Sequence, residues 1–286
     1  MRENMGAPEL FVAVPPVTVI RPSGGWIPLD PRELWEAREL LYVLVSRDIK
    51  ARYRQTTLGA AWAILQPFLA MIIFSIFFGR LIGISSEGIP YPVFAYSALV
   101  PWTYFANALG LAANSLVDNE QTLTKVYFPR LLVPATPVLA KLLDFGIAFV
   151  ILIGMMLFYG VAPTAAIWTL PFFVLLAAAT ALGVGVWLSA LTVVHRDIRH
   201  VVPFLVQFWL FATPVAYSSS LVPERWRALY GLNPMAGVVE GFRWALLGRA
   251  SVSGALLTVS TLTVAALLVS GLYYFRRVER TFADVV

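Results

Sequence analysis

The chain contains no cysteine among its 286 residues, which excludes a disulfide framework, a thiol nucleophile and a cysteine metal site. Charged residues are also few, at 13% of the chain. None of the three lysines, Lys50, Lys125 and Lys141, follows a glycine, so the Gly-Lys-Ser/Thr sequence of a phosphate-binding P-loop is absent. We therefore expect this chain to bind no nucleotide, cofactor or metal ion by itself.

Long apolar stretches dominate what is present. Hydrophobic residues make up 59% of the chain, whereas soluble domains hold about 45–50%. Most of six stretches are long enough to cross a hydrocarbon core of about 30 Å as a helix. They cover residues 58–79, 91–117, 142–160, 169–194, 201–217 and 251–275. Because backbone amides in lipid must be paired within their own segment, we predict an all-α integral membrane protein with six transmembrane helices.

The basic residues favour one side of this pattern. With a cytoplasmic N-terminus, 16 of the 21 Lys and Arg residues fall in cytoplasmic segments. Since positive residues accumulate in cytoplasmic loops, we expect both termini in the cytoplasm and the protein in the inner (plasma) membrane. The basic residues border the spans, so the net charge of +5 indicates contact with anionic membrane lipids rather than nucleic acid.

The N-terminal region divides into an arm and a helix. Residues 1–29 are rich in Pro and Gly and lack helical periodicity, which predicts a flexible cytoplasmic arm before a membrane domain over residues 30–286. Asp30 is the predicted N-cap of an amphipathic helix that ends near Arg54. Its position before the first span favours an interfacial helix on the cytoplasmic leaflet, with an ordinary surface helix as the alternative.

Two inner loops carry charges suited to binding a cytosolic protein. Residues 115–137 mix charged side chains with more apolar ones than a solvated turn needs. An open alternative is that the aromatic residues of this segment lie in the membrane interface. Residues 195–200 read HRDIRH, which fits neither a kinase catalytic loop nor a zinc-binding helix, so their predicted role is ionic. The predicted docking residues are Asp118, Glu120, Lys125, Tyr127, Phe128, Arg130, Arg196, Asp197 and Arg199.

The segment of residues 218–249, after the fifth stretch, differs from a simple loop. It contains two short amphipathic pieces split at Asn233, and neither is long enough to span. Non-helical backbone at membrane depth persists only where protein buries it or where it lines a cavity. We therefore predict an outer re-entrant helical hairpin between spans five and six, with Glu240 and Arg243 as a local pair. Two surface-lying helices are the alternative.

Asp144 is the one charged residue within the six stretches. An ionisable group inside a membrane is a candidate functional site, but Lys141 lies one turn earlier and a structural pair is the favoured interpretation. So few buried titratable groups argue against a proton-coupled carrier, and the missing carboxylate pair argues against a glycosyltransferase. Energy for transport is therefore expected from a cytosolic ATPase.

Four segments carry a family resemblance. They read RYRQTTLGAAWAILQP (52–67), LVPWTYFANALGLAANSLVDNEQTLTKVYFPR (99–130), HRDIRHVVPFLVQFWLFATPVAY (195–217) and NPMAGVVEGFRWALLG (233–248). In this order they resemble the permease subunit of type-2 ABC exporters, most closely those that export lipid-linked polysaccharides such as O-antigen, capsule and teichoic acid. The resemblance covers nearly the whole chain after the arm.

The resemblance implies a homodimer joined to two copies of a separate cytosolic ABC ATPase, which binds ATP and Mg²⁺. It makes the segment from Asp118 to Arg130 the coupling helix and residues 195–200 a second contact. The expected task is export of undecaprenyl-diphosphate-linked polysaccharide from the cytoplasm, with no enzymatic activity in this chain. A type-2 permease for a drug or small lipid, and a non-transporting membrane scaffold, are the alternatives.

Aromatic residues make up 14% of the chain, and several recur at helical spacing in the first and fifth stretches. Rings offer apolar faces to sugar CH groups, which would suit a polysaccharide channel. Packing between helices or facing lipid is the commoner role of such residues. The candidate channel aromatics are Phe74, Phe78, Phe204, Phe208, Phe211 and Tyr217.

Overall fold

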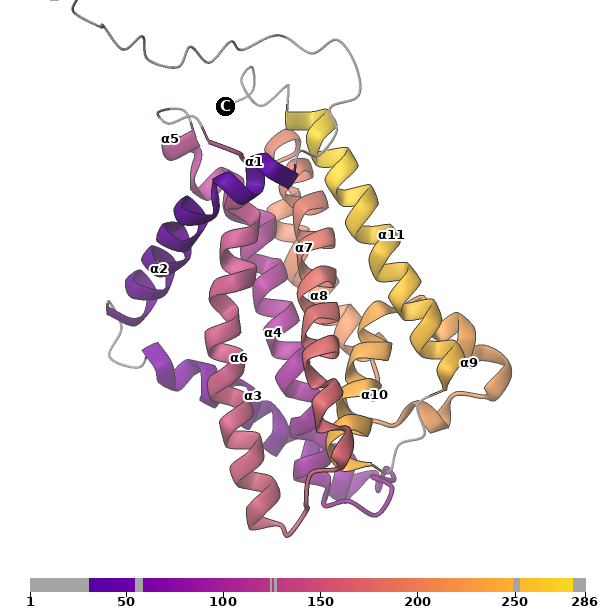
Figure 1. Ribbon diagram of the computed structural model, residues 1–286. Helices are drawn as coiled ribbons and strands as arrows, with labels where there is room; N and C mark the ends of the chain where they lie inside the picture. Colours follow the sequence, from indigo (N-terminus) through magenta and orange to yellow (C-terminus); the bar gives the residue numbers. More distant parts are fainter. Residues whose placement is uncertain (1–30, 55–58, 124, 126–127, 249–252, 280–286) are drawn as a thin grey trace, which may run out of the picture. The chain divides into compact units, whose positions relative to one another are not determined.

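The computed structural model describes residues 31–54, 59–123, 125, 128–248 and 253–279. The predicted arm, Asp30, Tyr127 and Arg249 lie outside these residues. Every regular element within them is a helix, which confirms the all-helical fold (Figure 1). Among the residues that the structure describes, four helical stretches are both long and apolar enough to cross a membrane. They are Ala61–Leu81, Leu132–Phe158, Ala165–Val194 and Gly254–Glu279.

The elements follow most of the predicted stretches. In chain order they are α1 (Pro31–Glu36), α2 (Arg38–Arg54), α3 (Gly59–Phe74), the π-helix η1 (Ser75–Leu81), α4 (Tyr91–Asp118), α5 (Glu120–Leu123), α6 (Leu132–Phe158), the 3₁₀ helix η2 (Ala165–Thr169), α7 (Leu170–Val194), α8 (Ile198–Ala212), the 3₁₀ helix η3 (Ser219–Leu221), α9 (Glu224–Tyr230), α10 (Pro234–Leu247) and α11 (Gly254–Glu279). The predicted N-terminal helix is thus two consecutive helices.

Two helix boundaries differ from the predictions. α6 begins at Leu132, well before the predicted residue 142. Pro134 lies in its first turn, where a missing amide hydrogen costs nothing, and Pro137 lies inside the helix. α8 ends at Ala212, so the prediction that the fifth helix reaches residue 217 is wrong. Thr213 is extended, with φ −100° and ψ 142°, as expected for a residue that precedes proline.

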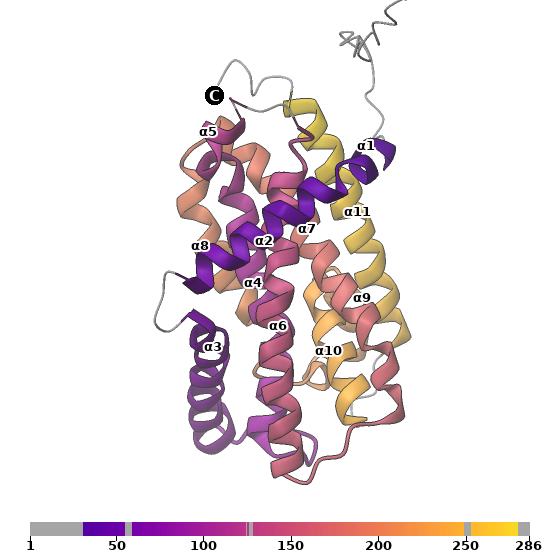
Figure 2. The same ribbon diagram turned by 60° about the vertical axis from the view of Figure 1, so that its left-hand side comes forward.

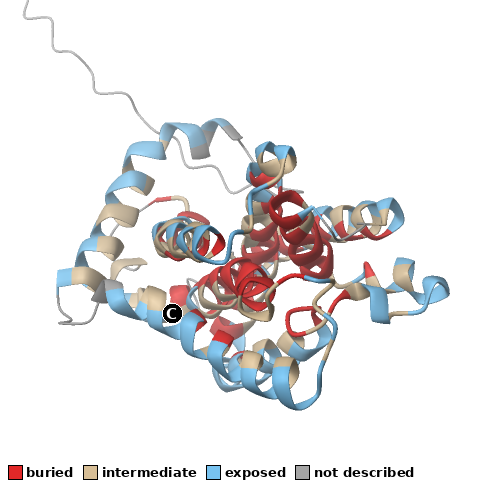
Figure 3. Cartoon of the chain, turned by 90° about the horizontal axis from the view of Figure 1, so that it is seen from below, coloured by how far each residue is buried: buried red, intermediate tan, exposed pale blue. Residues whose placement is uncertain are grey.

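The central helix of the unit is α4, which contacts α3, α6, α7, α8 and α10. Most of its residues are buried, and in Figure 3 the buried residues gather on the inner helices while the outer ones are largely exposed. α4 is long but holds more Tyr, Trp, Ser and Asn than the four apolar stretches. A helix enclosed by protein does not need a surface compatible with lipid, which explains this composition.

Glycines hold α7 between α4 and α11. A Cβ atom added at Gly185 would lie 2.7 Å from the Cβ of Ala112 in α4, and one at Gly183 would lie 2.9 Å from the Cα of Leu268 in α11. On α11, a Cβ at Gly271 would overlap the carbonyl oxygen of Gly183. Small residues allow this approach, and close packing is what drives helices together in a membrane.

Replacing Gly271 with Ala should therefore force α7 and α11 apart. We expect a loss of about 1–3 kcal/mol of stability, because an added methyl group in a packed interface strains its neighbours. The measurement is the midpoint of thermal unfolding of the purified protein in detergent. Gly154→Ala in α6 is the matched control, since an added Cβ there has no neighbour within 4 Å. Alanine favours helix over glycine, so this control should leave stability equal or higher. Equal effects of the two variants would contradict the tight α7–α11 contact.

Candidate functional site

The two predicted docking loops meet at one end of the helical unit. Nη2 of Arg199, in α8, lies 3.1 Å from Oδ1 of Asp118 at the end of α4, and both side chains are about half exposed. Arg47 of α2 donates a 3.4 Å hydrogen bond to the side chain of Asn119 beside them. In Figure 1 this end, with α1, α5 and the end of α11, is the upper one. Loops far apart in sequence thus form one connected surface.

The predicted docking residues divide by exposure. Exposed side chains are those of Asp118, Lys125, Arg196, Asp197 and Arg199, while Glu120 and Arg130 are half-buried. Phe128 is only 9% exposed and packs in an apolar cluster with Leu116 and Val193. It also lines a cavity of about 170 Å³ beside Asp118 and Thr122. The charged residues are therefore open to a partner, whereas Phe128 forms part of a cavity wall.

Asp144 joins the N-terminal helix to α6. Its Oδ2 lies 2.5 Å from Nζ of Lys141, which confirms the predicted pair. The same oxygen accepts from Arg52 of α2 at 3.3 Å, Arg52 also pairs with Asp48 at 2.8 Å, and the hydroxyl of Tyr53 donates to Oδ1. Burial, and then the bond to the carboxylate, raise the pKa of Tyr53 to about 12, so its hydroxyl keeps the proton that it donates. Figure 2 shows α2 crossing in front of α6.

Arg52 and Tyr53 were not predicted as partners of Asp144. The available signal was charge balance: a carboxylate near the inner end of a span needs cationic neighbours, and the amphipathic helix before the first span ends in Arg52, Tyr53 and Arg54. In the structure Arg52 contacts Asp144 of α6.

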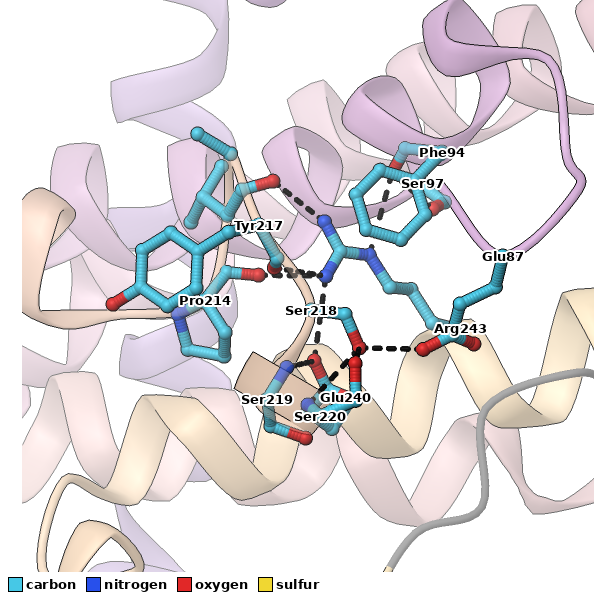
Figure 4. A network of polar contacts seen from close by, with 12 residues as sticks. Glu87, Phe94, Ser97, Pro214, Tyr217, Ser218, Ser219, Ser220, Glu240 and Arg243 are labelled. Atoms are coloured by element: carbon cyan, nitrogen blue, oxygen red, sulfur yellow. Dashed lines mark hydrogen bonds and ion pairs between the residues drawn. The ribbon is translucent and has the colours of Figure 1, made fainter. Parts of the chain in front are cut away.

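At the opposite end, the buried guanidinium of Arg243 in α10 binds four backbone carbonyls (Figure 4). Nη1 donates to Pro214 at 2.7 Å and to Tyr217 at 3.0 Å. Nη2 donates to Val215 at 2.5 Å, and Nε donates to Phe94 at 3.3 Å. The guanidinium also lies 3.7 Å from the centre of the Phe94 ring. One side chain therefore joins α10, the start of α4 and the non-helical segment after α8.

Glu240 balances the charge of Arg243. Its Oε1 lies 3.3 Å from Nη1 of Arg243, and the two side chains are 2% and 1% exposed, which confirms the predicted pair. Glu240 also accepts from the amide of Ser219, and the hydroxyl of Ser218 donates to Glu87 at 2.6 Å. The loop before α4 and the segment after α8 are thus fastened to α10.

Asn233 makes the predicted break between α9 and α10. Its side-chain oxygen caps α10 by accepting from the amide of Met235 and also accepts from the indole of Trp209 at 2.8 Å. Its amide group donates to the carbonyl of Ala212, the last residue of α8. All residues of α10 but one are buried, so α10 does not lie on the protein surface. α9 has no buried residue.

The candidate channel aromatics lie in three places. Phe204, Phe208 and Phe211 share an exposed face of α8, with 64%, 75% and 60% of each residue accessible. Phe74 and Phe78 are partly buried and meet edge to face, with ring centres 5.4 Å apart. Tyr217 lies beyond the end of α8, and its hydroxyl bonds to the carbonyl of Phe211 and to the hydroxyl of Tyr230. The structure groups the α8 rings and brings Tyr217 to the end of their helix.

Comparison with known proteins extends these observations. Residues 39–247 match the family model of the ABC-2 type transporter. The O-antigen export system permease protein RfbA of Myxococcus xanthus is 34% identical over 215 residues, which cover 74% of this chain and 82% of that protein. Its namesake in Klebsiella pneumoniae is 26% identical over 87% of this chain and 95% of its own length. The polysialic acid transport protein KpsM of Escherichia coli is 23% identical over 82% and 92%.

The buried ion pair predicts a large effect of Arg243→Met. This change leaves the Glu240 carboxylate and four carbonyls without their cation, so we expect a loss of about 3–5 kcal/mol of stability. Thermal unfolding in detergent measures it. The control is Arg227→Met, because Arg227 and Glu224 have the same spacing but Glu224 is 90% exposed. That change should cost no more than about 1 kcal/mol. Similar losses in both variants would contradict the role assigned to Arg243.

Proposed function

The chain belongs to the ABC-2 type transporter family, and from that premise we propose that it is the membrane permease subunit of an ATP-driven O-antigen exporter. It moves undecaprenyl-diphosphate-linked polysaccharide, O-antigen or a similar surface glycan, from the cytoplasm across the inner membrane. The observation that carries this proposal is the similarity of most of the chain to O-antigen export permeases from two genera. Similarity to a polysialic acid transporter supports a polysaccharide cargo.

Each subunit crosses the membrane six times in this proposal, with both termini in the cytoplasm. The four strongly apolar stretches supply four crossings, and α4 and α8 supply the other two. α8 has 15 residues and is about 22 Å long, which is shorter than the hydrocarbon core. The segment bound by Arg243 therefore completes the crossing that α8 begins. The contacts support this arrangement, because Asp118 and Arg199 of the predicted inner loops meet, and Glu87 and Ser218 of the predicted outer loops meet. α9 and the buried α10 form the outer re-entrant hairpin.

The exposed face of α8 supports a homodimer with a channel between the subunits. Phe204, Phe208 and Phe211 stand on this face, beside Val201 and Leu205. A second copy of the chain would cover part of it, and the remaining rings would line the path of the polysaccharide. Aromatic faces contact successive sugars without holding any one of them tightly, which suits a moving polymer.

Two copies of a cytosolic ABC ATPase bind ATP and Mg²⁺, and one copy docks on the inner end of each permease subunit. The surface formed by Asp118, Arg196, Asp197 and Arg199 is the proposed contact, and its exposed charges of both signs support this role. The Arg47–Asn119 hydrogen bond would transmit a displacement of this surface to α2. The bonds from α2 to Asp144 would transmit the displacement of α2 to α6.

Removing the gene from its host tests the proposed function. We expect surface O-antigen to disappear and lipid-linked polysaccharide to accumulate in the cytoplasm, because assembly continues while export stops. Immunoblots of surface glycan and extraction of the lipid-linked fraction measure the two effects. Restoring the chain together with its ATPase should reverse both. Normal surface O-antigen in the deletion strain, with loss of resistance to a drug, would favour the small-molecule permease instead.

Charge reversal at the inner end tests the docking surface. Asp118→Arg should lower the amount of ATPase that co-purifies by about tenfold, a loss of about 1.4 kcal/mol, because it places a cation where the partner meets an acid. The double variant Asp118→Arg with Arg199→Asp rebuilds the internal ion pair but should not restore binding. Full recovery of ATPase binding in the double variant would mean that docking requires only the ion pair between the two loops, and that neither charge contacts the ATPase. The control Glu224→Arg changes an exposed acid at the outer end and should have no effect.

A further inference from the structure

We propose that a cavity between α3, α4 and α6, near the end of α2, is a carbohydrate-binding subsite that holds one sugar ring of the translocating glycan. Trp62 supplies the aromatic face, and the amides of Gln66 and Asn107 supply hydrogen bonds to hydroxyl groups. The inference rests on the proposed function, since it takes a polysaccharide as the cargo. It adds a position at which that cargo is bound on the inner half of the permease.

The cavity has a volume of about 190 Å³. Pockets for drug-sized molecules hold about 300–1,000 Å³, so this one suits a single ring of a larger ligand. Its lining includes Trp62 and Gln66 of α3, Thr103 and Asn107 of α4, and Lys141 and Asp144 of α6. Trp62 is 55% exposed, which leaves one of its surfaces open.

The paired amides of Asn107 and Gln66 argue against hydrocarbon as the neighbour of this surface. Nδ2 of Asn107 donates to Oε1 of Gln66 at 3.1 Å, in an exposed contact between α3 and α4. Ala61 is the first residue of the apolar stretch that includes most of α3, and Gln66 lies about 8 Å further along it, at about 1.5 Å per residue. The second hydrogen-bonding group of each amide is still available there, and exposing such groups to lipid is costly. Water or a polar ligand is therefore the expected neighbour.

Charge balance selects a neutral ligand. Two cations, Arg52 and Lys141, line the cavity with the carboxylate of Asp144, and Asp48, which is not part of the lining, pairs with Arg52. With the charges matched, the site has no excess positive charge for a phosphate group. A neutral ligand rich in hydroxyl groups, with an apolar ring face for Trp62, fits the remaining chemistry.

The first test measures water access at Gln66. Because the chain has no native cysteine, Gln66→Cys can be labelled without background in the full permease, co-expressed with its ATPase and placed in nanodiscs. The control is Leu262→Cys, on an exposed apolar position of α11. Membrane-impermeant maleimide should label Gln66→Cys at least about tenfold faster, since only a hydrated thiol forms thiolate. Equal, slow labelling would place Gln66 against lipid or protein and overturn the proposal.

The second test asks what enters the cavity. The probe is polysaccharide released by mild acid from the surface glycan of the producing strain, with polyethylene glycol of similar size, which has no sugar rings, as the control. Labelling is followed at Ala63→Cys, a lining position that leaves Trp62 and Gln66 in place, and the released polysaccharide should slow it several-fold, whereas an equal mass of polyethylene glycol should not. Labelling that stays fast with both would show a water-filled cavity without a sugar site. Protection by short-chain phosphatidylglycerol alone would assign the cavity to a lipid. Either result would overturn the proposal.

A third test in cells separates this inference from the proposed function. In a deletion strain, the wild-type chain should restore surface O-antigen, and failure to do so would refute the exporter itself. Trp62→Ala should restore several-fold less, while Trp62→Phe, which keeps a ring, should restore close to the wild-type amount. Equal membrane levels of the three proteins on immunoblots exclude a folding defect. Normal export by Trp62→Ala would overturn the subsite and leave the exporter assignment intact.

Discussion

The need to pair every buried backbone polar group governs the end of this protein that contains α10. The path of α8 stops being helical at Thr213, and the segment that follows has carbonyls with no helical donor. Arg243 supplies donors to three of them, and Asn233 supplies one to the last residue of α8. The buried α10 is therefore the element that allows the broken helix to exist.

The two ends of the helical unit are held together by interactions of different strength. At the end that contains α10, the Glu240–Arg243 pair is almost fully buried, so separating it would leave uncompensated charges at a cost of several kcal/mol. At the opposite end Asp118 and Arg199 are half exposed, and such pairs contribute about 0–1 kcal/mol. Separating the contacts around Asp118 therefore costs much less free energy than separating those around Arg243.

Asp144 illustrates how far composition alone can lead. Its pairing with Lys141 followed from their spacing on one helix, because residues three apart share a face. Its bonds to Arg52 and Tyr53 depend on how α2 crosses α6, which no local pattern specifies. The contacts of Phe128 likewise depend on the packing of the helices. An aromatic residue in a charged loop was predicted as a docking residue, but Phe128 packs into an apolar cluster of this chain.

The sequence by itself determined the helical class, the apolar stretches, the break at Asn233 and the two local pairs, since each follows from hydropathy, proline chemistry or helical spacing. It also carried the family resemblance that the comparisons confirm. Only the tertiary structure decided where α8 ends, how Arg243 binds carbonyls far away in sequence, and which side chains line the cavity beside Trp62. These features arise from contacts between helices, and packing in a membrane depends on the shapes of both partners rather than on the pattern of either one.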